Sequence, residues 1–120
     1  MSKILIPLTD KNIAANGYQK LESGLIIQWG TFTATVNSGA GTTNTPMYQG
    51  SGGATFPIPF PNAVLNISLT TQDNTNIVLE YANIGGKTLT NFSSILGGIQ
   101  NQGTVPATTT LTVNWIAIGH

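Results

Sequence analysis

The chain has 120 residues, a length typical of one domain with a single core. Charged residues make up only 7% of it, and four lysines balance four carboxylates for a net charge of zero. Because binding to nucleic acid phosphates depends on clustered Lys and Arg, this composition argues against a nucleic acid partner. The absence of cysteine excludes disulfides and thiolate metal sites.

Residues 1–16 mix charge, Asn and a weak apolar pattern, and we interpret them as a lead-in rather than as part of the core. The initial MSKILIPL has only a short apolar run, interrupted by Pro7. Such a run is too short for the core of a signal peptide or for a membrane span. We therefore expect a soluble protein with no membrane insertion, whose domain covers residues 17–120.

The first strongly apolar segment, LIIQWGTFTATV, changes its pattern in the middle. Leu25, Ile27 and Trp29 share one face, but beyond Gly30 the apolar positions are those of Phe32 and the alternate residues after it. A β-bulge at Gly30 would return these later side chains to the buried face, so we expect one there and a core position for Trp29.

Residues 37–54 consist almost entirely of turn formers and small polar residues, which predicts a long loop. In the FPIPFP segment that follows, aromatic or aliphatic residues alternate with Pro57, Pro59 and Pro61. Because these prolines all lack the N–H donor on the same edge, the pattern predicts an edge strand with one neighbour.

Three later segments alternate with the period of a strand. Their expected inward residues are Ala63, Leu65, Ile67 and Leu69; then Ile77, Leu79 and Tyr81; and finally Leu111, Val113, Trp115 and Ala117. Residues 94–107 give no clear assignment. Since no stretch favours an amphipathic helix, we predict an all-β fold, most simply an antiparallel β-sandwich of about six to eight strands.

Three segments carry a resemblance to a known family: NGYQKLESGLIIQWG at 16–30, FPIPFPNAVLNISLT at 56–70 and NWIAIGH at 114–120. Together they resemble the C-terminal domain of bacteriophage and R-type pyocin tail fibres, over about residues 16–120. The chain departs from the family pattern at Glu22, where proline is usual, and at His120, where an aromatic residue is common.

The resemblance implies a β-sandwich knob at the tip of a virion tail fibre, made in the cytoplasm of the bacterial host. It also implies a homotrimer attached to an upstream fibre shaft, whose partner is a bacterial surface polysaccharide, either lipopolysaccharide or capsule. The starting methionine so close to the domain suggests an excised fragment, and a short natural gene is the alternative.

A trimer needs apolar side chains outside the core, and the alternation offers Val64, Val78, Ile116 and Ile118 as outward candidates. The alternative for them is packing within the chain. Three His120 side chains on a symmetry axis could bind a transition metal, with a frayed terminus as the alternative. We expect no metal site and no cofactor.

Counting strand reversals from the lead-in places three features at the end away from the shaft: loop 37–54, loop 83–87 and His120. It places the turn at 71–76, with Asp73 and Asn74, on the shaft side. Amide, aromatic and cationic groups suited to sugars then give the candidate carbohydrate-binding residues Asn44, Tyr48, Gln49 and Lys87. For Tyr48 the alternative is a packing role.

Two other functions are kept open. The domain could serve only to bring three chains into register for fibre assembly, without binding a receptor. A capsule-degrading enzyme would need two carboxylates facing across a cleft, and the four carboxylates of this chain leave only Glu22 and Glu80 as a pair. We therefore expect no enzymatic activity.

Overall fold

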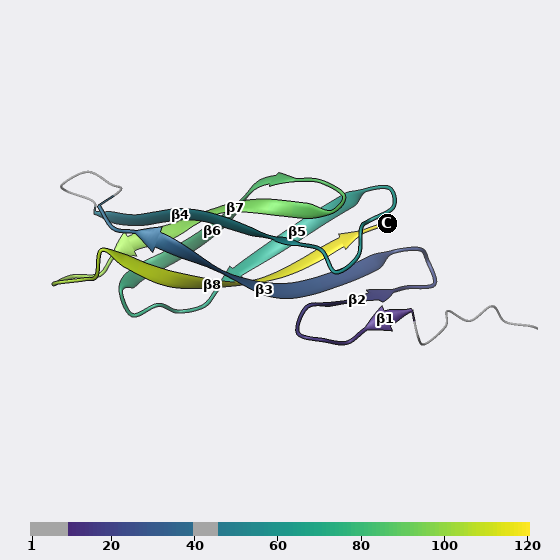
Figure 1. Ribbon diagram of the computed structural model, residues 1–120, viewed down its shortest axis with the longest axis horizontal. Coiled ribbons are helices and arrows are strands. Elements are labelled where there is room, and N and C mark those ends of the chain that lie inside the picture. The colour runs from purple at the N-terminus through teal and green to yellow at the C-terminus, as the bar shows by residue number, and fades with distance from the viewer. Residues whose placement is uncertain (1–9, 40–45) are drawn as a thin grey trace, which may run out of the picture.

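The computed structural model describes residues 10–39 and 46–120, which form strands and no helix (Figure 1). All strand pairs are antiparallel, as the all-β prediction requires. The strands are β1 (Lys11–Asn12), β2 (Gly17–Lys20), β3 (Ile26–Asn37), β4 (Met47–Thr55), β5 (Val64–Thr71), β6 (Ile77–Lys87), β7 (Asn91–Gln100) and β8 (Thr108–Gly119).

The strands form two layers. One layer has the order β1-β2-β3-β8-β5, and the other has the order β4-β7-β6. A single residue pair, Asn37 with Gln49, connects β3 to β4, so the sheet folds over on itself there into a sandwich. The molecule measures 68 × 22 × 17 Å, with its long axis along the strands (Figure 1).

The two ends of the long axis carry different connections. We call the end that holds the β2–β3 turn the proximal end, and the opposite end the distal end. Residues 72–76 and 101–107 lie at the distal end, whereas the β6–β7 turn and His120 lie at the proximal end. The predicted placement of residues 83–87, His120 and the 71–76 turn is therefore wrong. Strand β4, hidden in the predicted loop, adds one chain reversal and exchanges the ends of every later connection.

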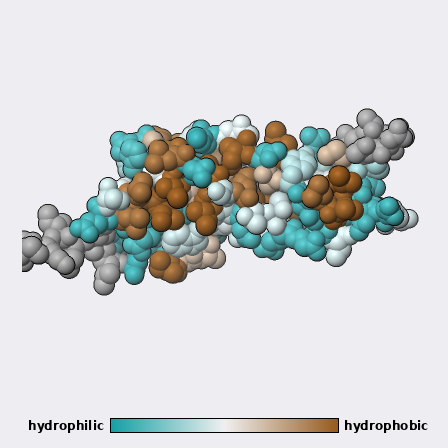
Figure 2. Space-filling view, turned by 180° about the vertical axis from the view of Figure 1, so that it is seen from behind, coloured by the Kyte–Doolittle hydropathy of each residue, from teal (hydrophilic) through white to brown (hydrophobic). Residues whose placement is uncertain are grey.

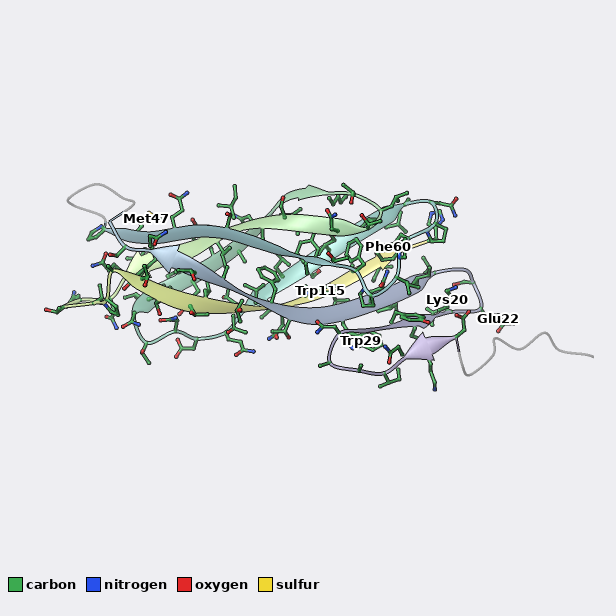
Figure 3. The ribbon with its side chains drawn as sticks, in the orientation of Figure 1. Lys20, Glu22, Trp29, Met47, Phe60 and Trp115 are labelled. Carbon is green, nitrogen blue, oxygen red and sulfur yellow. The ribbon has the colours of Figure 1, made fainter. Side chains whose placement is uncertain are left out.

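Strand β3 has no bulge at Gly30. It pairs with β8 without interruption from Ile26 opposite Gly119 to Asn37 opposite Thr108. The core face therefore includes Gln28, which is fully buried, and Trp29 lies on the outer face. There its Nε1 donates a hydrogen bond to the carbonyl of Ala14 at 2.9 Å, and Figure 3 shows the ring on the side of β2. The expected core position of Trp29 is wrong.

The predicted loop at 37–54 contains β4, whose glycines reflect close packing rather than a turn. A Cβ added to Gly50 would lie 2.4 Å from the carbonyl oxygen of Thr35, and one added to Gly52 would lie 2.9 Å from Cβ of Ala34. Larger residues at these two positions would push β4 away from β3. Glycine is required here so that the two layers can approach one another.

The FPIPFP segment is a connection and not an edge strand. Its alternation nevertheless directs Phe56 and Phe60 into the core, with ring centroids 4.9 Å apart. Figure 3 shows Phe60 and Trp115 between the layers. The N–H groups of Phe56 and Phe60 donate to the carbonyls of Thr90 and Leu89, each at 2.9 Å. The segment thus closes the proximal end of the sandwich.

Two bulges change the predicted faces of β5 and β6. The register of β5 shifts at Leu65, so Leu65 is 55% exposed and Val64 packs against the core. The register of β6 shifts at Val78, which leaves Leu79 63% exposed and facing outward. The outward position of Val64 and the inward positions of Leu65 and Leu79 were therefore wrong, because each bulge inverts the alternation.

Strand β8 follows its predicted alternation, with Leu111, Val113, Trp115 and Ala117 all buried. Trp115 belongs to an aromatic cluster that joins the layers: its ring centroid is 5.5 Å from that of Phe92 on β7 and 5.7 Å from that of Phe56. Edge-to-face contacts of this kind add to the stability gained from burial alone. Within residues 10–39 and 46–120 no helix reaches the length and apolar character of a membrane span.

Candidate functional site

The distal end is held together by side-chain amides. Asn74 donates from Nδ2 to the carbonyl of Thr110 at 2.9 Å, and its Oδ1 accepts from the N–H of Asn76 at 2.9 Å. Asn101 donates from Nδ2 to the carbonyl of Thr75, also at 2.9 Å. These bonds tie the 72–76 turn to β8 and to the segment after β7. The amide network therefore gives the distal surface a defined shape.

Three exposed polar side chains surround this network: Asp73, Thr75 and Gln102. Among the described residues, none of these side chains has a hydrogen-bond partner. A carboxylate, a hydroxyl and an amide provide both acceptors and donors for sugar hydroxyls. The arrangement is suited to binding a polar, uncharged ligand at a surface, and no enclosed pocket is detected in the described part of the chain.

Tyr48 is buried in the core with no exposed surface, and its hydroxyl donates to the carbonyl of Pro106. Burial raises the pKa of this hydroxyl above its ordinary value of 10.0. Its role is to anchor the segment after β7 against β4. A ligand at the surface cannot reach the ring, so Tyr48 is removed from the candidate site.

The other predicted sugar-binding residues are not brought together. Gln49 is exposed on the outer face of β4 near the distal end, while Asn44 lies outside the described residues. Lys87 is the last residue of β6, which begins at the distal end with Ile77. At about 3.3 Å per residue, the length of β6 separates Lys87 from the distal surface by roughly 30 Å.

The sequence interpretation missed Asp73 and its neighbours, because it placed the 71–76 turn on the shaft side. The signal was present in the polar string TQDNTN, which combines amides, a hydroxyl and a carboxylate in one turn. Only the position of the turn was wrong. Once β4 is recognised as a strand, the count of reversals moves the turn to the distal end.

The structure does not bring together Glu22 and Glu80, the two carboxylates that the sequence left as a possible catalytic pair. Glu22 lies in the proximal β2–β3 turn, whereas Glu80 lies near the distal end, where its Oε1 accepts from the N–H of Asn74 at 2.9 Å. Asp10 forms an ion pair with Lys20 at 3.4 Å. No group of three metal-binding side chains occurs in the described ranges, and the backbone of His120 is hydrogen-bonded to that of Ala63.

Large apolar side chains are exposed on both outer faces of the sandwich. On the β4-β7-β6 layer the exposed fraction is 60% for Val78, and on the other layer it is 52% for Ile116. Ile118 is half-buried, and Val64 packs against the core. Further exposed residues on the β6–β7 outer face are Leu79, Ile95 and Ile99. Figure 2 shows apolar side chains gathered along the rear of the molecule, where β5 and β6 lie.

Residues 20–120 match the family of C-terminal domains of gp53-like tail fiber proteins. The chain belongs to this family. The tail-fibre domain accordingly covers nearly all of the described structure, including both ends of the sandwich. No curated protein is similar enough to the chain to count as a match.

Solved structures of pyocin fibres share the fold. The R1 pyocin fiber of P. aeruginosa, comprising C-terminal residues 323–701, aligns with a TM-score of 0.66 and 22% identity over 92% of the chain. An N-truncated R2-type pyocin tail fiber aligns with a TM-score of 0.59 and 25% identity over 92%. The chain spans 27% of the R1 fiber and 36% of the R2-type fiber. An N-truncated R1-type tail fiber aligns with a TM-score of 0.64 and 22% identity over 92% of the chain. The chain spans 84% of the length of that fiber fragment.

Proposed function

We propose that this tail-fibre domain binds carbohydrate on the bacterial surface, in lipopolysaccharide or capsule, and so attaches the particle to its host. The observation that carries the proposal is the family match over residues 20–120, which makes the chain a terminal part of a tail fibre. A fibre acts by contact with the cell, and its end is the part that reaches the surface first. In this proposal, the domain is made in the bacterial cytoplasm and lies at the fibre tip, attached to the shaft through residues 1–16.

The distal end is the proposed binding surface. It lies at the far end of the 68 Å long axis from residues 10–20, through which the shaft would connect. Its exposed groups are Asp73, Thr75 and Gln102, supported by the amide network beneath them. The network holds the backbone that carries these side chains, which lowers the cost of ordering this surface on binding. Gln49 remains a proposed contact beside this surface. Asn44, outside the described residues, also remains a proposed contact, whereas Lys87, at the opposite end, does not.

We further propose that the domain functions as a homotrimer. Exposed Val78 on one outer face and Ile116 on the other support this, because a cyclic trimer gives each copy two neighbours and covers both faces. Ile118 is a proposed member of the same interface as Ile116. Three binding surfaces on one fibre would raise the avidity for a repeating polysaccharide without any new contact.

A glycan array tests the binding function directly. The purified domain, with its oligomeric state measured on the same sample, is expected to bind a subset of bacterial polysaccharides. A stable trimer that binds no polysaccharide would contradict receptor binding. That result would favour the alternative function, in which the domain only aligns three chains for fibre assembly.

The large separation between Glu22 and Glu80 argues against these two residues as the catalytic pair of a capsule-degrading enzyme. Glycoside hydrolases use two carboxyl groups within about 10 Å of one another, and these two lie at opposite ends of the molecule. We therefore expect polysaccharide incubated with the domain to show no increase in reducing ends. A steady increase that disappears in the Glu80→Gln variant would establish catalysis instead.

A further inference from the structure

Charge is distributed unevenly along the tail-fibre domain. The described lysines are Lys11 on β1, Lys20 on β2 and Lys87 at the proximal end of β6. The distal end has no lysine, arginine or histidine among its described residues, and residues 40–45 contain no charged residue in the sequence. The distal end does contain two carboxylates, Asp73 and Glu80. The described cations therefore all lie toward the proximal end, together with Asp10 and Glu22, whereas the charged groups described at the distal end are carboxylates only.

The distance between the ends makes this separation effective. The eleven residues from Ile77 to Lys87 span roughly 30 Å, whereas the Debye length at physiological salt is about 8 Å. The proximal lysines are therefore screened from any ligand at the distal surface. An anionic sugar bound there would meet only the negative charges of Asp73 and Glu80.

The two carboxylates differ in their availability. Glu80 is half-buried and already accepts a hydrogen bond from the N–H of Asn74 at 2.9 Å. Asp73 is exposed, and within the described ranges its side chain has no hydrogen-bond partner. A free carboxylate can accept hydrogen bonds from two adjacent sugar hydroxyls, and such charge-assisted bonds are stronger than neutral ones. The carboxylate of a uronic acid, or a phosphate group, offers no donor in return.

We propose that the distal surface selects neutral sugars over anionic ones, with Asp73 as an acceptor for ligand hydroxyls. This inference rests on the proposed carbohydrate-binding function and specifies the class of its ligand. At low salt, a single anionic group about 7 Å from Asp73 weakens binding about threefold through repulsion in water, and physiological salt reduces this factor. The effect grows with each acidic residue in a polymer, so acidic capsules are excluded more strongly than single acidic sugars.

The experiment uses the oligomeric domain on an array of bacterial O-polysaccharides and capsules, half of them neutral and half carrying uronic acid, sialic acid or phosphate. Neutral polysaccharides are expected to bind more tightly than acidic ones, and the difference is expected to shrink as the salt concentration rises. The Asp73→Asn variant, which keeps the size of the side chain, is expected to bind them about tenfold more weakly, as for a hydrogen bond to a charged group. The matched control is Glu22→Gln at the proximal end, which should leave binding unchanged.

The possible outcomes separate the inference from the function on which it rests. Binding of acidic polysaccharides as tight as that of neutral ones would overturn the neutral selectivity and leave carbohydrate binding in place. An Asp73→Asn variant with unchanged affinity for neutral polysaccharide would overturn the role of Asp73. If the folded oligomer binds none of the polysaccharides, the proposed function itself fails.

Discussion

The side-chain amide of Gln28 forms the two backbone hydrogen bonds that a neighbouring strand would otherwise form with Ile58. From inside the core, the Gln28 Nε2 donates to the carbonyl of Ile58 at 2.9 Å, and its Oε1 accepts from the N–H of the same residue at 3.0 Å. The proline-rich connection cannot pair as a regular strand, and this amide satisfies its central peptide groups. Gln28 thereby fixes the connection that closes the proximal end.

Replacing Gln28 with methionine should therefore destabilise the domain. The volume of the side chain is nearly kept, but the peptide N–H and carbonyl of Ile58 lose their partners in a buried setting, at a cost of about 2 to 4 kcal/mol. Denaturant unfolding followed by tryptophan fluorescence measures the change. The exposed Gln102→Met variant is the control and should stay within about 0.5 kcal/mol of wild type. Equal stability of Q28M and wild type would contradict the structural role of Gln28.

Tyr48→Phe should weaken the domain without affecting receptor binding. The substitution removes the hydrogen bond to the carbonyl of Pro106 and should lower the free energy of unfolding by about 1 kcal/mol. Because Tyr48 is buried, adsorption to host cells is expected to match that of wild type at temperatures where both are folded. Loss of adsorption by a folded Y48F trimer would return Tyr48 to the binding site.

The raised pKa of Tyr48 predicts that the difference in stability between wild type and Y48F changes at alkaline pH. Desolvation raises the pKa in the folded state above the ordinary 10.0, so the unfolded chain loses this proton first. The stabilisation is fully present below pH 10.0 and is lost as the pH rises through the pKa of the folded state. Wild type should therefore lose its advantage over Y48F above pH 10.0, as unfolding curves at stepped pH would show. A constant difference across this range would contradict a raised pKa.

Gly50→Ala should disturb the contact between β4 and β3. Its Cβ would lie 2.4 Å from the carbonyl oxygen of Thr35, a backbone atom that cannot turn aside. Overpacking of this kind costs about 1 to 3 kcal/mol, which thermal unfolding would detect. Gly85→Ala is the matched control, since its Cβ meets first a side-chain atom, Oγ of Ser93, at 3.1 Å. Equal effects of the two substitutions would argue against the close approach of the layers.

The proposed trimer can be tested by placing a charge on each outer face. Val78→Asp and Ile116→Asp should each raise the dissociation constant of the trimer about 30-fold or more, because a buried unpaired carboxylate costs at least about 2 kcal/mol. Sedimentation velocity over a dilution series measures the change. Ser23→Asp, at an exposed position of the β2–β3 turn and away from both outer faces, is the control and should remain trimeric. A monomeric wild type at micromolar concentration would contradict the proposal.

The sequence alone was sufficient for the fold class and for the elements with regular alternation. Strand β8 shows why: its buried residues alternate with outward ones from Leu111 to Ala117, and the pleat of a strand makes that pattern a local property. The FPIPFP segment is intermediate. Its alternation correctly directs Phe56 and Phe60 inward, although the segment is not a strand.

Contacts between residues far apart in the chain decide which face of a strand is buried and at which end of the molecule a connection lies. Gly50 and Gly52 look like loop residues until β3 lies against them, and Gln28 looks like a surface residue until Ile58 is opposite its amide. The bulges at Leu65 and Val78 are likewise visible only in the pairing with β8 and β7. Local sequence determines that side chains point alternately to the two faces of a strand, because this alternation comes from the backbone of the strand itself. The tertiary structure determines which side is buried and which end is distal, because both depend on partners far away in the chain.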